Sequence, residues 1–127
     1  MVAIANAPID LALLVEAARD PAAGGIDIFV GTVRDNSAGQ DVERLEYSAY
    51  APMAEKVMAD IEREIIERWQ ALRVVMVHRT GVLTVGEIAV VTIVSTPHRR
   101  EAFEACRYAI DEVKKRAPIW KKEILRD

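Results

Sequence analysis

The sequence contains a single cysteine and no long apolar segment. Because Cys106 is the only thiol, an intramolecular disulfide and a metal site built from several cysteines are both excluded. A lone cysteine also fits a reducing compartment. No apolar run approaches the roughly 18 residues needed to cross a bilayer, and no basic segment precedes an apolar stretch at the N-terminus. We therefore expect a cytoplasmic protein without a membrane segment.

Internal repeats, low-complexity linkers and aromatic-rich strands are also missing. The chain has 127 residues, of which 51% are hydrophobic and 29% charged, so it is long enough for one domain with a core and too short for two. We expect residues 1–127 to form a single domain. The net charge of −3 and the lack of an aromatic-rich strand argue against an RNA-binding domain. No nucleic-acid partner is expected.

Positive charge is concentrated near the C-terminal end. Residues 1–97 contain 8 Lys and Arg against 14 Asp and Glu, whereas residues 98–127 contain 9 against 6. The local charges are therefore −6 and +3. This asymmetry suits a small anionic ligand or an acidic partner.

Hydrophobic periodicity predicts an α+β fold in which helices and strands are interleaved. Three- and four-residue spacing of apolar positions predicts helices over residues 8–20, 51–69 and 98–116. Apolar and alternating segments predict strands over residues 26–33, 42–49, 72–79, 88–96 and 119–124, with a polar loop over residues 34–41.

The start of the last helix breaks a general rule about charge. Thr96 is a candidate N-cap and Pro97 suits the first helical position. His98, Arg99 and Arg100 then follow, although the helix dipole disfavours cations there. An anion bound by free backbone N–H groups and these side chains would resolve the conflict. A solvated basic turn, offset by nearby glutamates, is the other interpretation.

Several single residues have structural interpretations. Cys106 falls on the apolar helix face with Phe103 and Ile110, so we expect it in the core. His78 alternates in register with apolar strand residues and is expected to be packed or hydrogen-bonded. Trp120 could stack on a flat ring, but a buried structural tryptophan is favoured.

Seven segments carry a family resemblance, in order and spacing, over about residues 25 to 123. They are Phe29-Val30-Gly31-Thr32-Val33-Arg34-Asp35, Leu45-Glu46-Tyr47, Tyr50-Ala51-Pro52-Met53-Ala54, His78-Arg79-Thr80-Gly81, Val85-Gly86-Glu87, His98-Arg99-Arg100-Glu101-Ala102-Phe103 and Pro118-Ile119-Trp120-Lys121-Lys122-Glu123. Together they resemble the large, catalytic subunit of molybdopterin synthase. Many members of that family continue into a short tail with Gly and Trp, whereas this sequence ends at Asp127.

The resemblance implies an enzyme with an α/β-hammerhead fold that forms a homodimer. It implies a heterotetramer with two copies of a small ubiquitin-like subunit whose C-terminal Gly-Gly carries a thiocarboxylate. Sulfur would pass to cyclic pyranopterin monophosphate and form the dithiolene of molybdopterin, with neither a metal nor another cofactor on this subunit. The alternative is a non-catalytic module that binds a ubiquitin-like tail or a phosphate ligand.

The resemblance also implies the site residues. Lys114 and Lys121 match the two catalytic lysines of the family. The substrate-binding positions are Phe29, Arg34, His98 and Arg99, although composition alone favours the core for Phe29. The family suggests that His98 and Arg99 reach the pocket of the neighbouring subunit. Successive side chains point about 100° apart on a helix and to opposite faces on a strand. The lysines that follow each catalytic position should therefore point elsewhere.

Overall fold

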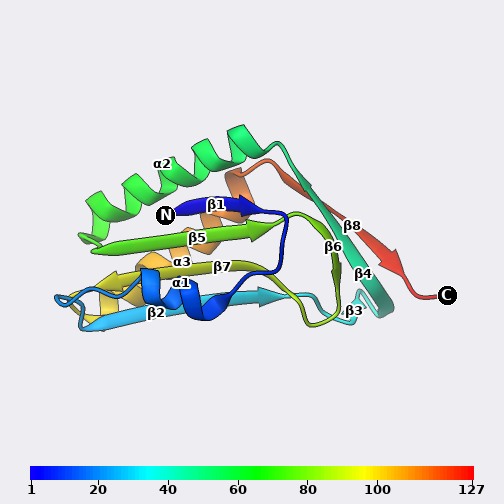
Figure 1. Ribbon diagram of the computed structural model, residues 1–127, viewed down its shortest axis with the longest axis horizontal. Helices are drawn as coiled ribbons and strands as arrows, with labels where there is room; N and C mark the ends of the chain where they lie inside the picture. Colours follow the sequence, from blue (N-terminus) through cyan, green and yellow to red (C-terminus); the bar gives the residue numbers. More distant parts are fainter.

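The computed structural model describes residues 1–127 as two β-sheets and three helices (Figure 1). The elements are β1 (Val2–Ala5), α1 (Leu11–Ala17), β2 (Gly25–Thr32), β3 (Asn36–Ser37), β4 (Gln40–Ala49), α2 (Ala51–Trp69), β5 (Arg73–Arg79), β6 (Gly81–Thr84), β7 (Ile88–Thr96), α3 (Arg99–Arg116) and β8 (Ile119–Leu125). The expected α+β class is confirmed.

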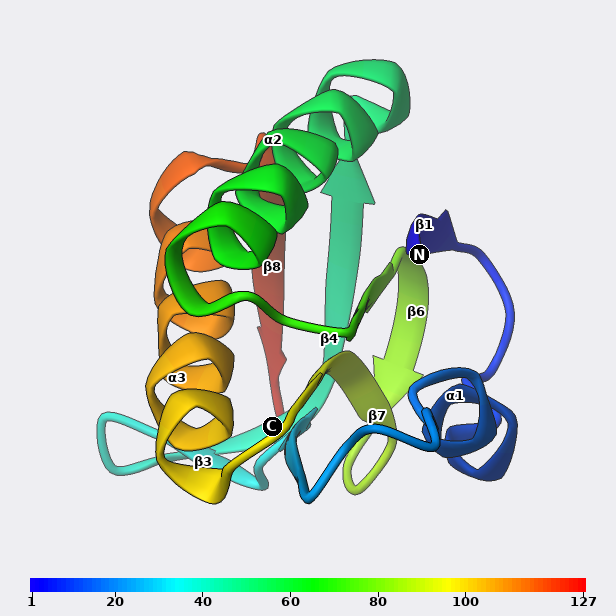
Figure 2. The ribbon, with the colours of Figure 1, turned by 90° about the vertical axis from the view of Figure 1, so that its left-hand side faces the viewer.

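The first sheet has the strand order β1-β5-β7-β2, with helices on both faces. Only β1 and β5 are parallel, and the other two pairs are antiparallel. Residues on β5 and β7 alternate between two apolar clusters because successive side chains point to opposite faces. Val74, Met76 and Val94 pack with α2 and α3, whereas Val75 and Ile93 pack with α1. Figure 2 shows α1 on the face opposite α2 and α3.

The second sheet is built around β4. This strand pairs with β3 and β6, and also with β8 along most of its length. A small hydrophobic cluster packs on this sheet and comprises Val33, Val42, Leu45, Leu83 and Ala89. Figure 1 places the second sheet at one end of the first, where β2 ends. That junction positions the candidate site.

An ion pair fixes the turn between β6 and β7. Buried Arg79 donates from Nη1 to Oε1 of Glu87 at 2.9 Å. The other oxygen of Glu87 accepts from the backbone N–H and hydroxyl of Thr84, at 2.7 and 3.1 Å. Two of the segments that carry the family resemblance are therefore joined by a structural contact.

All eight predicted elements are present, some with different boundaries. The helix over residues 51–69 and the strand over residues 88–96 have the expected limits. The first helix is shorter than predicted, since Asp10 is its N-cap and Ala18 its C-cap. Three short strands, β1, β3 and β6, were not predicted. No helix is long and apolar enough to cross a membrane.

The predicted N-cap of the last helix was wrong by two residues. Thr96 still belongs to β7, where it pairs with Gly25, and its hydroxyl donates to the carbonyl of His98 at 2.5 Å. His98 is the N-cap and Arg99 the first helical residue. Strand pairing thus prevails over the capping preference of threonine. The cationic first turn itself is confirmed.

Two side chains that were expected to be buried are exposed. Trp120 is 58% exposed, so its prediction as a buried residue was wrong. Phe103 lies on the predicted apolar face of α3, yet it is exposed. Cys106, in contrast, is buried in the core as predicted. Burial raises the pKa of its thiol to about 11, so the side chain stays protonated at neutral pH.

Candidate active site

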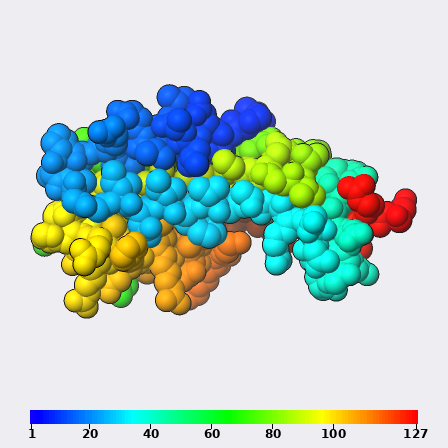
Figure 3. Space-filling view, turned by 90° about the horizontal axis from the view of Figure 1, so that it is seen from below, coloured from blue at the N-terminus to red at the C-terminus, as the bar shows by residue number.

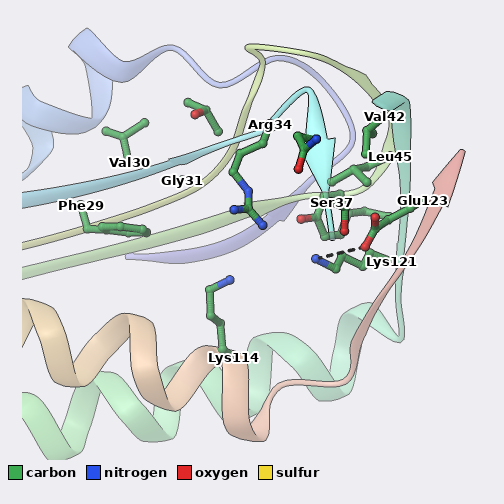
Figure 4. A pocket seen from close by; sticks show the side chains of 13 residues that line it. Phe29, Val30, Gly31, Arg34, Ser37, Val42, Leu45, Lys114, Lys121 and Glu123 are labelled. Atoms are coloured by element: carbon green, nitrogen blue, oxygen red, sulfur yellow. Dashed lines mark ion pairs between the residues drawn. The ribbon is translucent and has the colours of Figure 1, made fainter. Parts of the chain in front are cut away.

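A cavity of about 390 Å³ lies between the end of β2, the second sheet and the end of α3 (Figure 4). Four of the predicted site residues line it: Phe29 on β2, Arg34 just after β2, Lys114 on α3 and Lys121 on β8. These residues come from distant parts of the sequence, and the fold brings them to one place. Tyr47, Asn36, Ser37 and Glu123 also line the cavity and were not predicted.

The position of Arg34 follows from the end of β2. Pairing with β7 becomes irregular between Gly31 and Thr32, and Val33 is then buried in the core of the second sheet. The backbone N–H of Val33 donates to the carbonyl of Glu87 at 3.0 Å. This anchor turns the exposed side chain of Arg34 into the cavity.

The last turn of α3 carries three basic residues with different surroundings. Arg116 donates to Glu64 on α2 at 2.7 and 2.9 Å, and to Glu112 at 3.2 Å. Lys115 is exposed and does not line the cavity, whereas Lys114 does. Buried Val113 precedes Lys114 and fixes the helix against the core. The structure thus separates adjacent lysines, as the helical geometry predicted.

Lys121 reaches the cavity from β8. It pairs with Tyr47 on β4, so both side chains occupy the same face of the second sheet. Its ammonium group lies 3.9 Å from Oε1 of Glu123, two residues further along the same face. Lys122 is absent from the cavity lining, as strand alternation predicted.

The charges in the cavity are unbalanced. Arg34 and Lys114 make no ion pair with any carboxylate in the chain. Their two positively charged groups point toward one another (Figure 4). Glu123 is the one acidic residue in the lining, and it lies next to Lys121. Two facing cations repel one another, and an anion between them would remove that repulsion. The cavity is therefore suited to an anionic ligand.

A second cavity of about 250 Å³ adjoins the first and shares three lining residues with it, Tyr47, Lys114 and Lys121. Its additional lining residues include His78. His78 is buried and its Nδ1 lies 2.7 Å from the carbonyl oxygen of Arg79, as expected for a structural histidine. Its place beside Lys114 was not predicted, because the local sequence of β5 does not indicate which helix residues lie near His78 in the fold.

His98 and Arg99 lie far from this cavity within one chain. They begin α3, whereas Lys114 is near its end. Fifteen residues at 1.5 Å each separate Arg99 from Lys114 by about 22 Å along the helix axis. The start of α3 packs tightly on the start of β2, because a Cβ atom on Gly25 would lie 2.8 Å from Cα of Arg99. A single chain therefore does not unite all six predicted residues.

The sequence and structure are similar to those of known proteins. Residues 4–116 match the family described as MoaE protein. A molybdopterin synthase catalytic subunit from Bacillus subtilis is 46% identical over 98% of this chain and 79% of its own length. One from Pyrococcus abyssi is 50% identical over 80% of this chain and 68% of its own length.

Solved structures give the same result. Molybdopterin synthase from Staphylococcus aureus superposes with a TM-score of 0.94 at 43% identity, over 98% of this chain and 91% of that one. A complex of subunits 1 and 2 of molybdopterin-converting factor from Helicobacter pylori shares the fold, with a TM-score of 0.81 at 21% identity over 98% and 85% of the two chains. The match across sequence and fold shows that the chain belongs to the MoaE protein family, in which its relatives are molybdopterin synthase catalytic subunits.

Proposed function

We propose that this chain transfers sulfur from the C-terminal Gly-Gly thiocarboxylate of a small ubiquitin-like subunit to cyclic pyranopterin monophosphate, forming the dithiolene of molybdopterin. The observation that carries this proposal is the shared cavity of Arg34, Lys114 and Lys121, in which two cations lack a carboxylate partner. Both reactants are anionic, so the site must hold two negative groups close together.

Arg34 is proposed to bind the phosphate of the pterin substrate. A guanidinium presents several N–H donors in a plane and can contact two phosphate oxygens at once. Phe29 borders the same cavity and is 38% exposed, so its ring is available to a substrate. This arrangement places an apolar surface beside the proposed phosphate site.

Lys114 and Lys121 are proposed to be the catalytic residues. A lysine in its uncharged form can accept a proton or attack an acyl or hemiacetal-like carbon. The two side chains reach the cavity from different elements, α3 and β8. A substrate between them would therefore meet an amine from each side.

A small partner subunit is proposed to supply the sulfur. The Helicobacter protein with the same fold is described as a complex of two subunits. A Gly-Gly tail is thin and has no side chains, so it can enter a narrow opening. The second cavity adjoins the lysines and provides more room for such a tail.

The remaining cations, His98 and Arg99, are proposed to act in the cavity of a second copy of the chain. The outer edge of β2 has no strand beside it, and it carries exposed apolar side chains at Ile26, Ile28 and Phe29. Figure 3 shows β2 at the surface beside α3. An unpaired edge of this kind readily pairs with another strand. The surface is thus suited to a homodimer.

Antiparallel pairing of two β2 strands would also complete the site. With a two-fold axis near Ile28, Gly25 of the partner subunit would lie beside Gly31. Arg99 packs directly on Gly25, so the partner's α3 would begin near the cavity that Arg34 lines. This arrangement supports a homodimer, which two small subunits would complete as the proposed heterotetramer.

The function can be tested by mixing the protein with thiocarboxylated small subunit and cyclic pyranopterin monophosphate. We expect molybdopterin, detected by mass spectrometry, and a small subunit that ends in an ordinary carboxylate. The Lys114→Ala variant is the control for uncatalysed transfer. Tail binding without product from the intact protein would reject the enzyme and favour the non-catalytic module.

A further inference from the structure

His78 has an unoccupied acceptor atom beside the proposed catalytic lysine. The side chain points to the same face of the first sheet as Val74 and Met76, but it lies where that sheet meets the second one. Its ring contacts Tyr47 edge to face, with centroids 4.9 Å apart. The ring also lines the second cavity together with Lys114 and Lys121. The residue is therefore at the site and not only in the core.

The single hydrogen bond of the ring determines its tautomer. Nδ1 lies 2.7 Å from the carbonyl oxygen of Arg79. A carbonyl can only accept a hydrogen bond, so Nδ1 carries the proton. In the neutral ring Nε2 then has a free lone pair, and this atom has no partner within the chain. The backbone of β5 thus fixes which nitrogen is able to accept.

The surroundings keep the ring neutral at physiological pH. Burial lowers the pKa of His78, and the positive charge of Lys114 lowers it further. The other titratable groups lining this cavity are Tyr47 on β4 and Lys121 on β8. None of these is a carboxylate that would favour an imidazolium ion. A neutral acceptor therefore borders a cavity lined by two cations.

We propose that His78 is a positioning residue for Lys114: when this lysine turns from Arg34 toward the second cavity, its amino group donates a hydrogen bond to Nε2 of His78. The contact between His78 and Lys114 does not depend on the proposed function, whereas its expected effect on turnover does. Lys114 has a flexible side chain, no carboxylate partner, and a place in both cavities. A neutral acceptor can orient this lysine, whereas a carboxylate would neutralise the charge that attracts the substrates.

The contact can be tested by NMR without substrate. The chain has two histidines, so a His98→Asn variant assigns the ring signals in two-bond ¹H–¹⁵N spectra. We expect the Nδ1–H tautomer for His78 at pH 7. Lys114→Ala should raise the pKa of His78 because it removes a nearby positive charge, whereas Lys115→Ala should not. An Nε2–H tautomer, or equal responses to the two variants, would overturn the proposal.

Kinetics then test the consequence. His78→Asn keeps an amide donor near the Arg79 carbonyl but has no atom at the position of Nε2, whereas His78→Gln places a polar atom there. We expect His78→Asn to lower kcat about tenfold with little change in KM for the small subunit, and His78→Gln to keep more activity, as for a lost orienting contact. Equal kcat in all three proteins would refute the positioning role. The NMR result does not depend on turnover, so it separates this inference from the proposed function.

Discussion

Three basic side chains occupy the last turn of α3, and their surroundings give each a different role. Arg116 is engaged by glutamates, Lys115 is exposed, and Lys114 lines both cavities. Charge alone would make the two lysines equivalent, because they are adjacent and equally cationic. The geometry instead predicts that only Lys114 serves the reaction.

Replacement of Lys114 should therefore be far more harmful than replacement of its neighbour. We expect Lys114→Ala to lower turnover by about 100-fold or more, a range typical of lost acid–base catalysis. Lys114→Arg should not restore activity, because a guanidinium stays protonated and cannot act as a base or nucleophile. Steady-state rates of molybdopterin formation give the comparison.

Lys115→Ala is the matched control and should keep nearly full activity. Circular dichroism and binding of the small subunit must be unchanged in each variant, since lost folding or docking would imitate a catalytic defect. Equal losses of turnover in the two alanine variants would show that Lys114 contributes only a positive charge that binds anions.

At the scale of elements, α2 and α3 are joined by a polar contact on their surface. Glu64 on α2 accepts from Tyr108 at 2.6 Å and from both terminal nitrogens of Arg116. These partners lower the pKa of Glu64 from 4.5 to about 2, with the Arg116 hydrogen bond as the largest cause. Because the folded pKa lies below the unfolded one, this stabilisation is present above pH 4.5 and is lost as the pH falls toward 2.

Glu64→Gln should therefore lower the free energy of unfolding at pH 7. We expect a loss of about 1 kcal/mol, since partly exposed ion pairs are screened by solvent. The difference from the unsubstituted protein should shrink between pH 4.5 and pH 2, as measured by urea unfolding. Glu67→Gln on the same helix is the control, because Glu67 has no ion-pair partner. A difference that stays constant with pH would contradict this account.

The unpaired edge of β2 gives a prediction about assembly. Ile28→Lys places a charge at the centre of the proposed interface, and charged side chains prevent edge-to-edge pairing. We expect the variant to sediment as a monomer while keeping its circular dichroism spectrum. Ile66 on α2 is similarly exposed and lies away from this edge, so Ile66→Lys should leave the dimer intact. A dimeric Ile28→Lys protein would place the interface elsewhere.

Local sequence patterns predicted the long elements well and the short strands poorly. α2 and β7 carry continuous periodic signals, which fixed their boundaries. β1 has four residues and exists because it pairs in parallel with β5, more than 70 positions away in the chain. β6 also has four residues, and it exists because it pairs antiparallel with β4. Such strands are determined by distant partners, which no local pattern contains.

At the scale of the whole molecule, the proposed site needs two chains. A homodimer of Arg34→Ala chains and a homodimer of His98→Ala chains would each lack one substrate-binding residue in both pockets. A mixed dimer would keep one intact pocket, with Arg34 from one chain and His98 from the other. If the chains exchange freely, about half of the dimers are mixed, so about a quarter of the pockets should work.

Mixing these two inactive variants should therefore restore activity to about a quarter of the normal value. The matched control is a mixture of Arg34→Ala and Lys114→Ala, whose altered residues line the same cavity of one chain. That mixture should stay inactive, because neither pocket of the mixed dimer is complete. Recovery in both mixtures, or in neither, would argue against a pocket shared in this way.

The site could be predicted from the sequence only through family resemblance. Arg34 and Lys121 are ordinary surface cations by local criteria, and nothing in the chain places them near Lys114. Tyr47 and His78 were not predicted as site residues, because their strands meet α3 only in the folded molecule. The cationic first turn of α3 was the single local signal, and within one chain it lies away from the cavity.

The length of α3 determines how one altered chain affects a population of mixed dimers. In the proposed dimer each copy of this helix serves two pockets, its own through Lys114 and the neighbour's through Arg99. A chain altered at one end would still leave one working pocket when paired with an intact chain. A chain altered at both ends would disable both pockets of a mixed dimer, leaving about a quarter of dimers fully intact when the two chains are made equally. With equal amounts of the two chains, damage at one end of α3 would thus leave about half of all pockets working, and damage at both ends only about a quarter.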